Sequence, residues 1–217
     1  RALGHRPFRL YFFGQGVSVL GSWIQQVALA WLVYRLTGSA ALLGMSAFAS
    51  LSPILLVGPL AGAWIDRHDR RRLLMGVQVL LFIQACMLAA LTWFELIGPV
   101  LIILMSLSLG VLNAIDTPLR QSLIPAMVGG REDLPNALAL NAMLFNLGRF
   151  IGSPIAGLML SFTSEAACFL LNAFTYLALL WGVAVMRFEA PEKASGSVGH
   201  VFKEGVRFAI DTWPIRT

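Results

Sequence analysis

Residues 41–72, ALLGMSAFASLSPILLVGPLAGAWIDRHDRRR, carry the pattern that decides the fold. Residues 41–65 are predominantly apolar and contain no charged side chain. A helix needs about 20 such residues to cross the hydrocarbon core of a bilayer. The seven residues that follow hold four arginines and two aspartates. The stretch therefore predicts a transmembrane helix that ends in a charged loop at one membrane surface.

The same alternation of apolar runs and short charged segments continues along the chain. Of its 217 residues, 58% are hydrophobic and 12% are charged, whereas soluble domains are typically about 25% charged. Backbone groups find no water in hydrocarbon, and the runs lack the alternation of barrel strands, so each run is expected to be helical. The predicted spans lie near residues 11–35, 41–65, 73–94, 97–117, 136–160 and 166–186.

The basic residues predict the orientation of these spans. With a cytoplasmic N-terminus, the inside segments, including Arg120, hold fourteen of the sixteen lysines and arginines. The other two are Arg35, near the first outside loop, and Arg149, within the fifth span. The positive-inside rule then places both chain ends in the cytoplasm. Because the basic residues flank apolar spans, the partner of this basic chain is expected to be the lipid bilayer and not nucleic acid.

The composition changes near the end of the sixth span. We expect residues 1–188 to form a transmembrane bundle and residues 189–217 to begin a cytoplasmic linker. Residues 201–210 have apolar side chains at helical spacing, which predicts either a helix along the membrane surface or the start of a seventh span. Since the chain starts without methionine and stops just after this stretch, we expect it to be part of a longer protein.

Two short segments resemble each other. Residues 58–62, GPLAG, lie in the second span, and residues 152–157, GSPIAG, lie in the fifth, so the pattern Pro-aliphatic-Ala-Gly occurs twice. Transporters are often built from inverted repeats that retain weak internal likeness. The second and fifth spans are the pair that a three-plus-three inverted repeat would relate.

The loop between the second and third spans carries the most specific motif. Residues 62–74, GAWIDRHDRRRLL, closely resemble the major facilitator superfamily signature G-x-L-x-D-R-x-G-R-R/K-x-x-L. Trp64 replaces the aliphatic residue of the signature, and Asp69 replaces its second glycine. The matching residues are Gly62, Asp66, Arg67, Arg70 and Arg71.

The resemblance implies that this loop is a conformational latch. In that interpretation Asp66 and the arginines hold the N-terminal half of a transporter against its C-terminal half in the outward-open state. A carboxylate at a helix end can bond to arginines or face the positive N-terminus of another helix. A small residue at Gly62 would let a neighbouring helix approach. The alternative is a plain positive-inside anchor.

A second motif lies in the fifth span. Residues 146–157, NLGRFIGSPIAG, resemble the G-x-x-x-G-P-x-x-G antiporter motif of major facilitator exporters. The proline is displaced by one residue, to Pro154. Glycines at this spacing predict a tightly packed helix that can bend at the proline, and generic packing is the alternative. The motif residues are Gly148, Arg149, Gly152, Pro154 and Gly157.

Together with residues 31–39, WLVYRLTGS, these motifs resemble the enterobactin-exporter-like and drug:proton antiporter branch, over residues 8–186. The resemblance implies an all-α bundle that is half of a twelve-helix fold in the bacterial inner membrane. It also implies proton-coupled export of siderophores, drugs or other amphipathic compounds, with a missing C-terminal six-helix half as partner and no cofactor. Uptake of a small solute and a non-transporting scaffold are the alternatives. No enzyme motif such as G-x-S-x-G or H-E-x-x-H is present.

Polar residues inside the spans are candidates for function. A charge at Arg149 costs several kcal/mol unless it is paired or hydrated, and Asp116 is its candidate partner, as a locking pair or as a gating group. The proton-coupling acid is expected to be Asp116, Glu95 or a residue of the second half. Other polar residues could line a central cavity or make interhelical hydrogen bonds. They are Gln25, Gln26, Asn113, Asn141 and Asn146.

Overall fold

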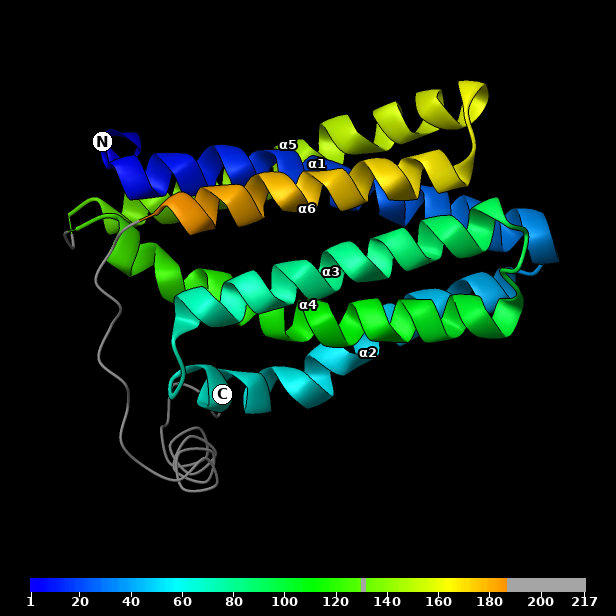
Figure 1. Ribbon diagram of the computed structural model, residues 1–217, viewed down its shortest axis with the longest axis horizontal. Helices are drawn as coiled ribbons and strands as arrows, with labels where there is room; N and C mark the ends of the chain where they lie inside the picture. The colour runs from blue at the N-terminus through cyan, green and yellow to red at the C-terminus, as the bar shows by residue number, and fades with distance from the viewer. Residues whose placement is uncertain (130–131, 187–217) are drawn as a thin grey trace, which may run out of the picture.

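The computed structural model describes residues 1–129 and 132–186, which form six long helices that run back and forth (Figure 1). A short 3-10 helix, Ala2–Gly4, precedes them. All six helices are long and apolar enough to cross a bilayer, which confirms the predicted count. The predicted linker and amphipathic helix lie outside the described residues. The helices are α1 Arg6–Thr37, α2 Ala40–Ile65, α3 Arg70–Trp93, α4 Pro99–Met127, α5 Leu134–Phe162 and α6 Glu165–Val185.

Local capping explains where the shortest connections fall. Gly38, with φ of 59°, ends α1 in the left-handed conformation that glycine adopts without strain. The side chains of Ser39 and Ser164 accept hydrogen bonds from the amides of Leu42 and Ala167, and so cap α2 and α6. Two tight turns therefore join α1 to α2 and α5 to α6 at the same end of the bundle.

The fourth helix differs from its prediction. Hydropathy ended the span at residue 117, but α4 continues to Met127 through Pro118 and Pro125. The apolar run stops there because Asp116 and Arg120 are charged. In the structure these two side chains pair with each other inside the bundle, so the helix stays buried past the point where hydropathy falls.

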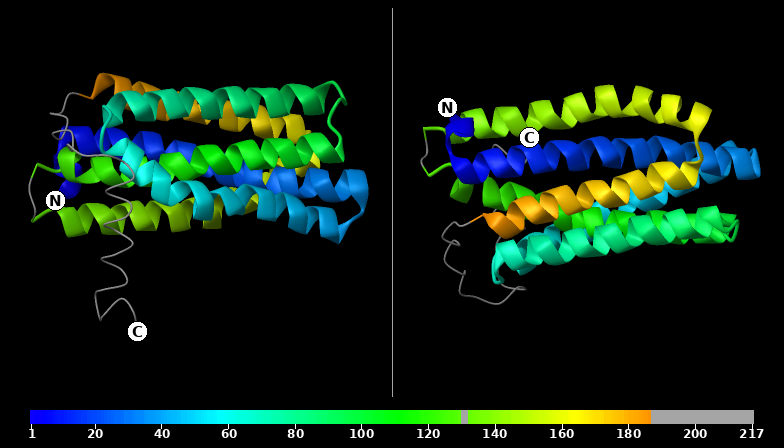
Figure 2. Two further views of the ribbon diagram at one scale, coloured as in Figure 1. Left: turned by 90° about the horizontal axis from the view of Figure 1, so that it is seen from below. Right: turned by 45° about the horizontal axis from the view of Figure 1, so that its top comes forward.

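The packing of the helices follows an internal two-fold relation. Helix α1 packs against α5 and α6, α4 packs against α2 and α3, and α3 packs against α6 (Figure 2). Exchanging α1 with α4, α2 with α5 and α3 with α6 turns α1–α5 into α4–α2 and α1–α6 into α4–α3, and leaves α3–α6 unchanged. This agrees with the inverted repeat that the sequence predicts. Helices α4 and α5 touch each other little.

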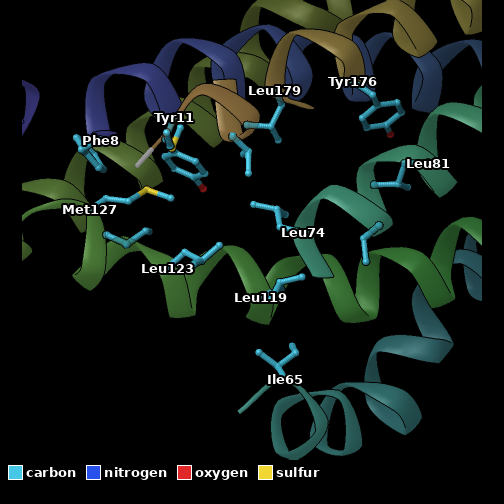
Figure 3. Packing of buried hydrophobic residues seen from close by; sticks show 14 of the residues in the cluster. Phe8, Tyr11, Ile65, Leu74, Leu81, Leu119, Leu123, Met127, Tyr176 and Leu179 are labelled. Carbon is cyan, nitrogen blue, oxygen red and sulfur yellow. The ribbon is translucent and has the colours of Figure 1, made fainter. Parts of the chain in front are cut away.

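The larger apolar core fills the end of the bundle that holds the α2–α3 loop. Phe8 and Tyr11 of α1 lie there with Leu74 of α3, Leu123 of α4 and Leu179 of α6 (Figure 3). A second cluster fills the other end. The outward faces are also apolar, with many large side chains exposed, as expected where lipid is the solvent.

Glycines set the closest helix contacts. A Cβ on Gly152 would lie 2.9 Å from the Cβ of Trp23 and 3.2 Å from the backbone oxygen of Leu20, both on α1. Gly148 meets Val19 of the same helix. The predicted tight packing is confirmed at these two positions, which are spaced i and i+4. At Gly157 an added Cβ meets no described atom within 4 Å.

The substitution Gly152→Ala is expected to destabilise the bundle by about 1–3 kcal/mol, because the added methyl group overpacks the α1–α5 contact. The matched variant Gly157→Ala adds the same methyl group in open space and should leave stability unchanged or slightly improved. The midpoint of thermal unfolding in detergent measures both. Equal midpoints for the two variants would contradict the packing described.

Candidate functional site

The α2–α3 loop is fastened to α4 through one arginine. Asp66 accepts a hydrogen bond of 2.9 Å from Arg70, and the same guanidinium donates one of 3.2 Å to the backbone oxygen of Ser122 on α4. The carboxylate therefore orients Arg70, and Arg70 holds the loop against the neighbouring helix.

Asp69, which stands where the signature has glycine, caps α3. Its φ of −65° is in the ordinary region, so the turn does not need glycine. Its carboxylate accepts hydrogen bonds of 3.0 and 3.1 Å from the amides of Arg71 and Arg72. These amides would otherwise lack partners at the helix start. The departure from the signature thus stabilises the start of α3.

Arg71 reaches the end of α6. Its Nε donates to the backbone oxygen of Val183 at 3.1 Å, and its Nη2 donates to that of Ala184 at 2.7 Å. These carbonyls belong to the last turn of α6, where intrahelical donors run out and a cation is favourable. The loop therefore fixes the last turn of α6, immediately before residue 187.

Two other motif residues, Gly62 and Arg67, lack the contacts with neighbouring helices that the other three make. A Cβ on Gly62 would meet nothing within 4 Å, so no described helix makes the close approach predicted there. The Nη2 of Arg67 is buried without a hydrogen-bond partner among the described residues. Within the described residues, the hydrogen bonds of the motif are therefore made by Asp66, Arg70 and Arg71.

The substitution Arg71→Ala is expected to lower the free energy of unfolding by about 1.5–3 kcal/mol, because it removes two charge-assisted hydrogen bonds to α6. The neighbouring variant Arg72→Ala removes the same charge from a side chain that is 84% exposed, and should cost less than 1 kcal/mol. Thermal unfolding of both variants in detergent measures the difference. A loss at Arg72 as large as that at Arg71 would contradict the role of the α6 contacts.

A charged pair lies inside the bundle. Asp116 and Arg120, one turn apart on α4, form an ion pair of 2.6 Å with both side chains less than a tenth exposed. Gln78 of α3 donates to the other oxygen of Asp116 at 2.7 Å, and Arg120 donates to the side-chain oxygen of Gln15 on α1. The network thus joins three helices.

This network corrects two predictions. Arg120, expected in a cytoplasmic segment, lies within α4, and Asp116 pairs with it and not with Arg149. Both carboxylate oxygens of Asp116 are already engaged, and α4 meets α5 little, so Arg149 has no route to it. The i, i+4 spacing of Asp116 and Arg120 was the available sequence signal.

Arg149 instead lies on the outside of this bundle. Its side chain is exposed, and its guanidinium carbon lies 5.4 Å from the ring centroid of Trp23 on α1, within the range of a cation–π contact. It forms no ion pair with any acidic residue that the structure describes. Trp23 is the same residue that Gly152 packs against.

Gln25 belongs to a second buried network. It accepts a hydrogen bond of 2.7 Å from Asn172 of α6 and donates one of 3.4 Å to Gln84 of α3. Its side chain is buried, so it makes interhelical hydrogen bonds and does not line an open surface of the bundle. Asn141 accepts a weak 3.5 Å bond from the hydroxyl of Tyr11.

The remaining candidates stay accessible. Gln26 of α1 and Asn146 of α5 are exposed, and Asn113 of α4 is partly buried. The amide of Asn146 donates back to the backbone oxygen of Ala142. Their role as cavity-lining residues stays a prediction.

Removing one member of the Asp116–Arg120 pair is expected to cost about 3–5 kcal/mol of stability, because the other charge stays buried without its partner. Asp116→Asn, Arg120→Gln and the double variant form a cycle. The double variant should lose clearly less than the sum of the single losses, measured by unfolding in mixed micelles. Additive losses would contradict the coupling.

Comparison with known proteins decides the family. Residues 2–217 match the family of transmembrane secretion effectors. This chain belongs to that family of major facilitator transporters. Members of this family are transporters and not enzymes, and the six helices of this chain form half of the major facilitator fold, as the loop motif implied.

Several relatives of this major facilitator chain are named for transport. It is 33% identical over 190 residues to the staphyloferrin A transporter of Staphylococcus aureus, covering 85% of this chain and 48% of the relative. It is 28% identical to macrolide efflux protein A of Streptococcus pyogenes, over 71% of this chain and 38% of the relative. Identity to the multidrug efflux pump Tap of Mycolicibacterium fortuitum is 27%, over 97% and 54%. The chain thus spans about half the length of these curated relatives.

Proposed function

We propose that this chain is the N-terminal half of a proton-coupled exporter of siderophores, drugs or other amphipathic small molecules, which works by alternating access in the bacterial inner membrane. Relatives named for transport of a siderophore, macrolide efflux and multidrug efflux support this class of substrate. The second six-helix half would be the partner that closes the cavity. The observation that carries the proton coupling is the buried Asp116–Arg120 pair.

The distribution of charge supports a cytoplasmic N-terminus. The N-terminus, the α2–α3 loop and the end of α6 lie at one end of the bundle (Figure 1). Arg67 lies in that loop, and Arg70, Arg71 and Arg72 form the first turn of α3 directly after it. At the other end, Arg35 is paired with Glu165 at 2.6 Å. The positive-inside rule then makes the arginine-rich end cytoplasmic.

The coupling step we propose is protonation of Asp116. A proton on the carboxylate removes its charge and weakens the bond to Arg120, whose cation must then find another partner. Three polar atoms of this network are buried without a partner in the described structure: Nε2 of Gln15, Oε1 of Gln78 and Nε of Arg120. They could form hydrogen bonds to water, or to Asp116 and Arg120 after these two side chains have moved apart. Because the network joins α1, α3 and α4, a change in the pair acts on all three helices.

The α2–α3 loop would act as the latch between the halves. Arg70 and Arg71 hold the loop on α4 and α6, so it moves with this bundle. Gly62, which no described helix approaches within 4 Å, is the residue we assign to contact with the second half. Gln26, Asn113 and Asn146 are assigned to the cavity wall. The loop would also serve as a positive-inside anchor, and the two roles are compatible.

Flux measurements test the proposed function. The full-length transporter in liposomes should move a hydrophobic dye against its gradient when a pH gradient is imposed. Asp116→Asn should abolish this uphill movement, because the group that exchanges the proton is lost, but should allow downhill movement. Glu95→Gln, which changes an exposed acid in the turn after α3, should transport like the unaltered protein. Absence of gradient-dependent flux, inward accumulation, or an active Asp116→Asn variant would contradict the proposal.

A further inference from the structure

Arg149 lies near the middle of α5, where an unpaired charge is costly. Among residues 1–129 and 132–186, the structure shows two arginines well inside the spans, Arg120 and Arg149, and only Arg120 has an acidic partner. A cation at the centre of a membrane helix costs about 2.5–3.5 kcal/mol or more unless it reaches water or an anion. The position of Arg149 therefore requires a polar surrounding outside this bundle.

The periodicity of α5 places Arg149 opposite an exposed aliphatic surface of the same helix. With 3.6 residues per turn, Asn146 and Ser153 fall on the same side of the helix as Arg149. Leu147 and Ile151, both exposed, fall on the opposite side. Gly148 and Gly152, which pack on α1, separate the two surfaces on one flank. Asn146, Arg149 and Ser153 thus form a polar group on one side of α5, which also carries the exposed Phe145, and the opposite side is aliphatic.

Trp23 holds the guanidinium from one face only. The guanidinium carbon lies over the Trp23 ring at 5.4 Å from its centroid, and the side chain makes no hydrogen bond to a described residue. Its N–H donors therefore stay available to a partner outside the described residues. Gln26, exposed and three residues after Trp23 on α1, adds an amide on the same helix.

We propose that Arg149, in cation–π contact with Trp23, binds a carboxylate or a similar planar oxyanion on the transported compound. A guanidinium can bind a carboxylate through two parallel hydrogen bonds, which gives both affinity and orientation. The inference rests on the proposed function and narrows its substrate class to amphipathic anions. An acidic side chain of the second half is the competing partner for Arg149, and the experiment separates it from substrate.

The test uses the full-length transporter in detergent and two fluorescent probes, dansyl-phenylalanine and its methyl ester. They differ by one carboxylate charge, and dansyl emission reports binding. The acid should bind about 10- to 100-fold more tightly than the ester, the effect of a hydrogen-bonded charge pair. Arg149→Gln should abolish this preference, and Arg149→Lys should reduce it, because an ammonium lacks the planar fork. Arg9→Gln, which removes an exposed arginine in the first turn of α1, should keep the preference for the acid.

Each other result contradicts the inference. Equal binding of acid and ester, absence of binding by both, or a preference that survives Arg149→Gln would exclude an oxyanion site at Arg149. If Arg149→Gln fails to fold, Arg149→Lys decides. An undiminished preference for the acid in Arg149→Lys excludes two parallel hydrogen bonds from the guanidinium to the carboxylate. A lower unfolding midpoint with an unchanged preference identifies the acidic side chain of the second half as the partner. Flux of the hydrophobic dye under the pH gradient is scored separately, so failure of this inference leaves the exporter proposal standing.

Discussion

The hydrocarbon core of the bilayer satisfies no hydrogen bond, and the rest of the structure depends on that constraint. It makes every span helical, since only a helix pairs its own backbone groups. It also forces polar side chains inside the bundle to pair with one another. Asp116 with Arg120, and Gln25 with Gln84 and Asn172, are such pairings. Small residues such as Gly152 then bring the helices close enough to pack without a hydrophobic driving force.

Polar groups of this chain fall into two sets that differ in what they contact. The first set lies between the helices and is bonded mostly within the bundle, so it fixes the relative positions of α1, α3, α4 and α6. The second set, which includes Gln26, Asn146 and Arg149, lies on surfaces that the bundle does not cover. In the transporter that we propose, of which this chain would be about half, these surfaces would face the second half. The division between the sets is what gives the candidate cavity a location.

Hydropathy was sufficient for the number of helices, because span length and apolar content follow directly from bilayer thickness. It failed where charges neutralise each other: the end of α4 and the burial of Arg120 depend on an ion pair that hydropathy ignores. The loop motif predicted the family from fixed positions, but the contacts of Arg71 with α6 need the folded bundle. The partner assigned to Arg149 was wrong because sequence alone does not tell which helices adjoin.

The spacing of Asp116 and Arg120 also bears on how the protein is made. Helices enter the membrane in chain order, yet α1 packs against α5 and α6, so its neighbours are synthesised last. Polar groups on α1 that pair with α6 therefore have no partner until α6 is made, and meanwhile face lipid or the insertion machinery. The Asp116–Arg120 pair can form without a later helix, because its two members lie one turn apart on α4. Helix α4 can therefore insert with its charges already neutralised, before any other helix reaches it.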